Sequence, residues 1–148
     1  RWDASGRRAT CSGDLTVPAG TAWQGDLVCH GDLMLGPRCG VGGSLKVRGR
    51  LTVGPGCSIS GNVFAEREAE LGAGCTVHGV LMSEMAIALD TGCWLGLLAS
   101  PITVAAPRVD IGAGVEVHGT VWAEVQGRCV AAEVAEPVAS FGAQAVAS

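Results

Sequence analysis

Residues 50–61 read RLTVGPGCSISG and residues 68–79 read EAELGAGCTVHG, so the same pattern returns after 18 residues. The frame also fits four further segments, which start at Asp14, Asp32, Ala86 and Arg108. The first four steps between consecutive segments are 18 residues long, and the fifth is 22. Self-similarity at a constant period is typical of solenoid proteins, in which each unit stacks on the next.

Apolar residues take fixed places within this 18-residue unit. Counted from its first residue, they fall in pairs at positions 2 and 4, 8 and 10, and 14 and 16. The step of two within a pair is the period of a strand that buries one face. The step of four between pairs allows a corner, after which the same face is buried again. The pattern therefore predicts an all-β fold, a single-stranded parallel β-helix of about six triangular turns with strands about 4.8 Å apart.

The composition agrees with many short strands joined by tight turns. The 148 residues include 23 Gly; 48% are hydrophobic and only 16% are charged. Each glycine would cost roughly 1 kcal/mol inside a helix, whereas at a corner it adopts positive φ cheaply. The low charge and high apolar content exclude an intrinsically disordered chain.

Charge is unevenly distributed along the chain. Residues 1–50 hold seven Lys and Arg against four Asp and Glu, whereas residues 51–148 hold three against ten, for a net charge of −4. The negative balance argues against nucleic acid as a partner. The difference between the two parts predicts an orienting effect when copies or partners dock.

The extent of the repeat sets the expected domain boundaries. Residues 14–130 are expected to form the β-helix, and residues 1–13 an N-terminal tail with a partial first turn. Residues 131–148 are expected to form a C-terminal tail or cap, because Glu133 would otherwise fall at a buried position.

The fifth unit is four residues longer than the others and predicts a loop. We place Ile102 and Val104 at the inward positions 14 and 16, so that residues 96–100 bulge from the coil.

All seven cysteines fall at inward positions, and four of them share position 8: Cys39, Cys57, Cys75 and Cys93. A straight file of sulfur atoms cannot surround one zinc ion tetrahedrally. Neighbours in register would lie about 4.8 Å apart, beyond the usual Cβ separation of about 3.5–4.5 Å in a disulfide. We expect core-filling thiols, with disulfides as the alternative, no metal and no cofactor. Reduced thiols fit a cytosolic compartment.

The sequence offers no familiar catalytic constellation. It contains no P-loop, GxSxG or HExxH motif. His78 and His118 share the outward position 11 but are expected to lie about 9.6 Å apart, too far to share a metal. We expect them, like the carboxylates Glu66, Glu84 and Glu124 at position 17, to be solvated surface residues, and we predict that the protein is not an enzyme.

The outward position 15 is unusually apolar, since it reads Val28, Lys46, Phe64, Met82, Thr103 and Trp122. Contiguous exposed apolar surface generally marks an interface. The candidate lateral or partner strip comprises Val28, Phe64, Met82, Trp94 and Trp122. The alternative is that residues 131–148, through Phe141, cover the strip.

The two ends of a β-helix expose core and unpaired backbone groups, which template pairing with another chain. The candidate polymerisation residues are Ala9, Cys11, Leu15 and Val17 at one end, and Val121, Ala123, Cys129 and Phe141 at the other. Trp2 and Phe141 are candidate plugs for these ends.

Several units resemble the polymer-forming repeats of the bactofilins, a family of bacterial cytoskeletal proteins. The matching segments are RLTVGPGCSISGNVFAE (50–66), EAELGAGCTVHGVLMSE (68–84) and RVDIGAGVEVHGTVWAE (108–124). The resemblance covers roughly residues 13–125. It implies a right-handed β-helix that assembles end to end into filaments without nucleotide, scaffolds cell-shape and cell-wall proteins and often associates with the membrane. The cysteine file, the 96–100 loop and the scarcity of charge depart from the family pattern.

We therefore expect a structural, self-assembling cytoskeletal protein whose principal partner is itself. Membrane-associated or cell-wall proteins are further expected partners, in the cytoplasm at the inner face of the membrane, with no small-molecule substrate. One alternative is a hexapeptide-repeat acyltransferase-like trimer, active or inactive, although residues 96–100 carry no histidine. Another is a capping or adaptor subunit of a larger assembly.

Overall fold

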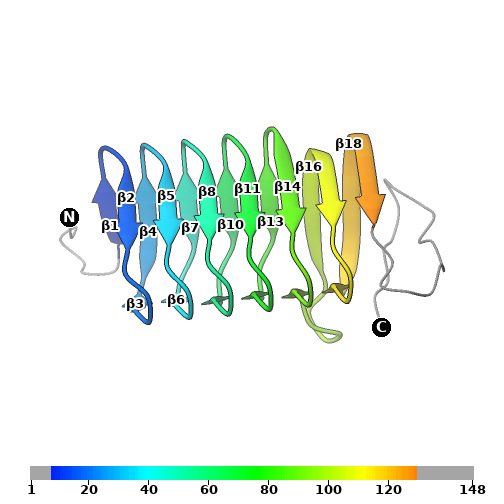
Figure 1. The fold of residues 1–148 in the computed structure, drawn as a ribbon, viewed down its shortest axis with the longest axis horizontal. Coiled ribbons are helices and arrows are strands. Elements are labelled where there is room, and N and C mark those ends of the chain that lie inside the picture. The colour runs from blue at the N-terminus through cyan, green and yellow to red at the C-terminus, as the bar shows by residue number, and fades with distance from the viewer. Residues whose placement is uncertain (1–7, 130–148) are drawn as a thin grey trace.

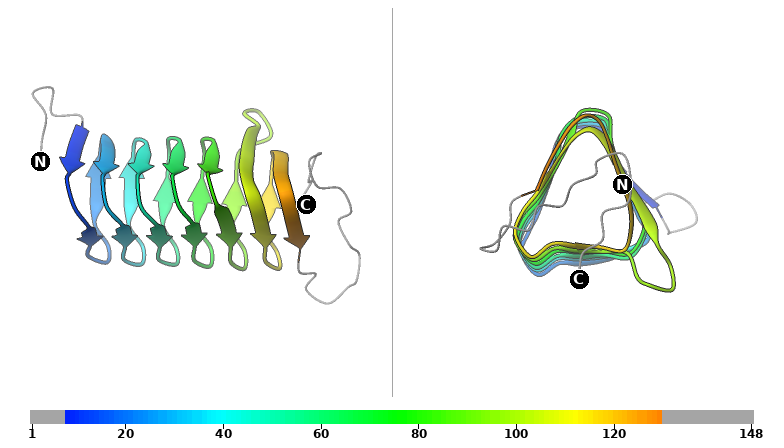
Figure 2. Two further views of the ribbon diagram at one scale, coloured as in Figure 1. Left: turned by 90° about the horizontal axis from the view of Figure 1, so that it is seen from above. Right: turned by 90° about the vertical axis from the view of Figure 1, so that its right-hand side faces the viewer.

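The computed structural model describes residues 8–129, which form a three-sided rod of stacked coils without a helix (Figure 1). Seen along the rod, successive coils superimpose as a triangle (Figure 2). The coils follow one another about every 18 residues and make about seven turns. The predicted parallel β-helix is confirmed, with one turn more than expected. Trp2, Glu133, Phe141 and the rest of residues 131–148 lie outside the described residues.

The rod has three faces, which we call A, B and C. Face A holds the strands at positions 14–16: β1 (Arg8–Cys11), β4 (Asp26–Cys29), β7 (Leu45–Val47), β10 (Val63–Ala65), β13 (Leu81–Ser83) and the first halves of β16 (Ile102–Ile111) and β18 (Gly119–Cys129). Face B holds the strands at positions 2–4: β2 (Leu15–Val17), β5 (Leu33–Leu35), β8 (Leu51–Val53), β11 (Ala69–Leu71), β14 (Ala86–Leu89) and the second halves of β16 and β18. Face C holds the remaining short strands: β3 (Ala22–Gln24), β6 (Gly40–Gly42), β9 (Ser58–Ile59), β12 (Thr76–Val77), β15 (Trp94–Leu95) and β17 (Glu116–Val117).

The coil is right-handed. Viewed from its C-terminal end, the chain climbs face A, crosses the upper corner to descend face B, and returns along face C at the base (Figure 2). It therefore turns anticlockwise as it advances toward the viewer. The long loop projects from the corner between faces C and A.

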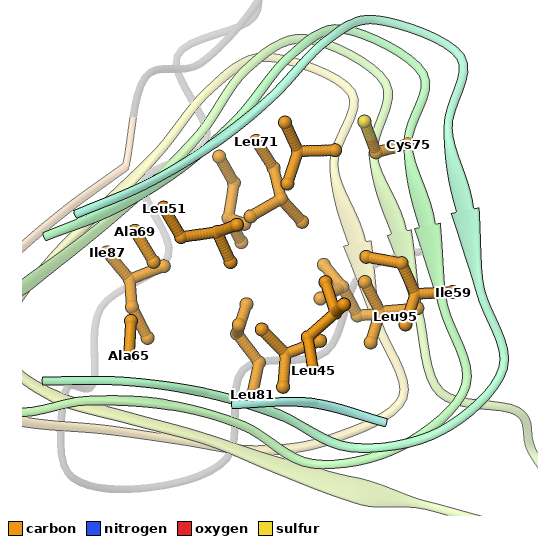
Figure 3. Close-up of a cluster of buried hydrophobic side chains, with 14 of the residues drawn as sticks. Leu45, Leu51, Ile59, Ala65, Ala69, Leu71, Cys75, Leu81, Ile87 and Leu95 are labelled. Carbon is orange, nitrogen blue, oxygen red and sulfur yellow. The ribbon is translucent and has the colours of Figure 1, made fainter. Parts of the chain in front are cut away.

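The strands pair in parallel, and neighbouring partners are one repeat apart. Leu33 is paired with Leu51, and Val63 with Leu81. Because one face of every strand points to the axis, the alternation buried–exposed–buried recurs along the chain. Figure 3 shows the buried side chains from all three faces meeting inside the triangle.

Two ladders of polar side chains cap backbone amides at the corners. Asp14 Oδ1 accepts a hydrogen bond from the amide of Asp32 at 2.8 Å, and Asp32 Oδ1 accepts one from Arg50 N at 2.8 Å. At a second corner, side-chain oxygens of Asp26, Ser44 and Asn62 do the same for the next coil. These bonds give the corner amides of each coil a side-chain partner in the preceding coil.

The predicted register of β16 is wrong by two residues. Val104, not Ile102, is paired with Leu81 and takes position 14, so Ala106 takes position 16 and Ala105, not Thr103, takes position 15.

Two opposite irregularities explain this error. Val104 follows Leu95 by nine positions, whereas Leu81 follows Val77 by four, so the loop is longer than predicted. The next corner is shorter, and the register shifts between Ala106 and Arg108, around Pro107. Proline lacks an N–H and is tolerated at such a bulge.

Candidate assembly surfaces

Among residues 8–129, each end of the rod is formed by edge strands. At the N-terminal end, β1, β2 and β3 each pair with only one neighbour. At the C-terminal end, β17 pairs only with β15, and β18 only with β16. The outer side of an edge strand is where a further strand can pair.

The N-terminal end is hollow and apolar. A cavity of about 330 Å³ opens there, and the four predicted end residues Ala9, Cys11, Leu15 and Val17 all line it. Leu15, Val17 and Cys11 are only partly buried, unlike their equivalents in the next coil. The structure therefore brings the predicted N-terminal residues together on one surface.

Trp23 lines the same cavity but is missing from the predicted end residues. Its indole Nε1 donates to the Asp26 carbonyl at 3.4 Å. Trp23 takes the inward position 10 of the first unit. It could have been predicted at this end, since every inward residue of the first coil lies at the end of the rod.

The C-terminal end is formed by β17 and β18. Val121 is fully buried on β18, whereas Ala123 and Cys129 on the same strand are partly buried against the core. Ala123 lies on face A and Cys129 on face B, so together they border the open end of the triangle. Phe141, the fourth predicted residue here, lies beyond the described part of the chain.

The predicted strip lies mainly on face A. Phe64, Met82, Ala105 and Trp122 are consecutive partners in β10, β13, β16 and β18. Met82 and Trp122 are 41% and 49% exposed. Val28 lies on the same face in β4, separated from Phe64 by Lys46. Trp94 does not belong to this strip, because it lies on face C in β15.

A shallow groove of about 420 Å³ follows the C-terminal part of the strip. Its lining includes Met82, Ala105, Pro107 and Trp122 together with the carboxylates Glu84 and Glu124. The groove thus combines an apolar floor with acidic groups, and none of the basic residues in the described part of the chain lines it.

The cysteine file runs through the interior, as predicted. Cys39, Cys57, Cys75 and Cys93 are buried and not joined in disulfides. Their thiols donate to backbone carbonyls of the preceding coil at 3.1–3.2 Å. Burial raises the pKa of the Cys57 thiol, and a hydrogen bond with Cys93 together with burial raises the pKa of Cys75. A protonated thiol is a poor nucleophile and metal ligand, and residues 8–129 hold no group of three or more metal-binding side chains.

His118 differs from the solvated surface residue that was predicted. Its side chain is only 10% exposed, and its ring lies 5.4 Å from that of Trp94, centroid to centroid. The Nε2 atom lies 3.5 Å from Glu116 Oε1. The stacking of coils buries His118. Trp94 is paired with Glu116 one turn later, and its ring covers His118, the next outward residue after Glu116. His78 is exposed, as expected, and His30 is exposed too.

Comparison with protein-family models, with curated proteins and with solved structures finds no match to this chain. Within residues 8–129, no helix has the length and hydrophobicity needed to cross a bilayer.

Proposed function

We propose that this protein is a structural, self-assembling element whose rods join end to end through their edge strands. The observation that carries the proposal is the composition of the two ends, where edge strands surround apolar side chains that are only partly buried. Each interstrand hydrogen bond formed at such a junction contributes a net ~0.5–1.5 kcal/mol. Burial of the end side chains adds about 25 cal/mol per Å² of apolar surface.

The role that fits this assembly best is that of a bactofilin-like cytoskeletal polymer, on the repeat motifs quoted above. Such a polymer forms without nucleotide and scaffolds membrane-associated or cell-wall proteins from the cytoplasm. Catalysis has no part in this role, because stacking of strands and apolar ends supplies the whole mechanism.

Two end variants test the proposal. Val17→Arg and Cys129→Arg each place a charge at one open end, where it would lose its hydration in a junction. We expect the unmodified chain to sediment as large assemblies and each variant as no more than two chains. Met34→Arg is the matched control, because Met34 is 51% exposed on the outer side of β5.

Circular dichroism would show that the variants keep their strands. Assemblies of unchanged size in both end variants would contradict the proposal. A trimer that persists in both would instead favour the acyltransferase-like arrangement, in which rods associate side by side.

A further inference from the structure

Face A of the rod carries an apolar ladder and two oppositely charged halves on its outer surface. The ladder runs from Phe64 through Met82 and Ala105 to Trp122. Outward positions on face B are more polar, for example Thr52, Glu70 and Asp110. Exposed apolar surface of this kind marks a contact surface.

The charges on face A divide at β10, where the Glu66 carboxylate lies 3.9 Å from Arg48 Nε of the same chain. On the N-terminal side, Lys46 and Arg48 are exposed, and Arg8 lies at the far end in β1. On the C-terminal side, Glu84 and Glu124 are exposed beside the groove. Among the described residues of the N-terminal half of face A, the one acid is Asp26, whose carboxylate accepts a hydrogen bond from the Ser44 amide at the corner. The face is therefore complementary to itself after a half-turn.

We propose that face A docks against face A of a second copy, with the two rods antiparallel. The seven strands of this face have β10 in the middle. A twofold axis parallel to the strands at β10 places Phe64 against its own symmetry mate. It also places Arg48, directly after β7, opposite Glu84, directly after β13 in the other copy, and Val28 of β4 opposite Ala105 of β16. Lys46 falls opposite Met82, where its methylene stem covers apolar surface while the ammonium group stays in water.

The buried area of this contact is that of a weak interface. Seven strands spaced about 4.8 Å apart make a face about 29 Å long. With a width of about 10 Å, the two copies bury roughly 600 Å², below the ~1,200 Å² of stable interfaces. The pairing is thus weak between single chains and strengthens when it repeats along two joined rods. Two single chains can pair in this way without an end junction, because the end junctions involve other residues.

Charge reversal with exchange of partners tests this geometry. The experiment uses the full chain carrying Val17→Arg and Cys129→Arg, so that end junctions do not contribute, and measures sedimentation equilibrium over a concentration series at low ionic strength. We expect a monomer–dimer equilibrium. Arg48→Glu or Glu84→Arg alone should weaken it roughly tenfold, because both cross-copy pairs become like-charged.

An equimolar mixture of the Arg48→Glu and Glu84→Arg chains should restore the dimer, because every cross-copy pair is again opposite in sign. Glu70→Arg on face B is the control and should leave the association unchanged. Raising the salt concentration should weaken the dimer, since exposed charge pairs are screened.

Three results would overturn the inference: a chain that stays monomeric at every concentration, single reversals that associate like the parent, or a mixture that fails to recover. A monomer would also be expected if another part of the chain or another protein occupied the strip. If the chain without end substitutions sediments like the end-substituted chain, the end-to-end proposal fails. The dissociation constant of the face A dimer is measured separately and still tests the lateral proposal.

Discussion

Arg38 occupies a corner position at which other coils place glycine. Its φ is 59°, and the equivalent Gly20, Gly56, Gly74, Gly92 and Gly114 have φ between 70° and 73°. A residue with a Cβ atom is strained in this left-handed region by about 1–2 kcal/mol. The repeat predicts glycine at this corner. Arg38 is the exception, and it adopts the same left-handed backbone conformation as the glycines.

Arg38→Gly should therefore stabilise the fold. Relief of strain is partly offset by the greater freedom of glycine in the unfolded chain, so we expect a gain of about 0.5–1 kcal/mol in the free energy of unfolding. Denaturant titration measures the change. Arg50→Gly is the control and should destabilise, because Arg50 is not among the positive-φ residues. Equal effects at both positions would show that the corner is not strained.

Cys57 tests the packing role of the cysteine file. Its side chain is 1% exposed, and its thiol donates to the Gly36 carbonyl at 3.1 Å. Cys57→Ala leaves a small cavity and should lower the free energy of unfolding by about 1–2 kcal/mol. Ser58→Ala, at the adjacent exposed position, should have little effect. If both substitutions are equally neutral, the file does not contribute to core packing.

At the scale of the elements, regular coils could be predicted strand by strand, and β16 could not. Eighteen-residue spacing fixes which side chain stacks on which, as the pairs Leu33–Leu51 and Val63–Leu81 illustrate. Around β16 the loop is two residues longer than predicted and the corner at Pro107 two residues shorter, so the two differences cancel in length. The sequence gives only the combined length of the loop and the corner, so it could not predict the register of the strand between them.

Deletion of residues 97–101 tests the corrected register. It leaves Gly96, Ile102 and Thr103 between Leu95 and Val104, the same number as between Val77 and Leu81. We expect a folded chain whose melting temperature stays within a few degrees of the parent, because Leu98, 87% exposed, contributes little burial.

Deletion of residues 97–100 alone is the comparison. It leaves one residue too many at the corner and should be the less stable variant by thermal denaturation. The opposite order of stability would support the register with Ile102 at position 14.

At the scale of the whole molecule, the sequence predicts some of the candidate surfaces and not others. The N-terminal residues Ala9, Cys11, Leu15 and Val17 could be predicted together, since the first coil of any solenoid borders an open end. Burial of His118 beneath Trp94 could not, because it depends on how outward side chains of neighbouring coils pack. The charge division of face A is visible in sequence only after each residue is assigned to a face.

The junction between rods is the central claim, and electron microscopy of the purified full chain without nucleotide tests it most directly. We predict unbranched filaments whose axial repeat matches the length of one or two rods, each about seven coils at about 4.8 Å per coil. Particles no longer than a single rod at every protein concentration would contradict end-to-end assembly.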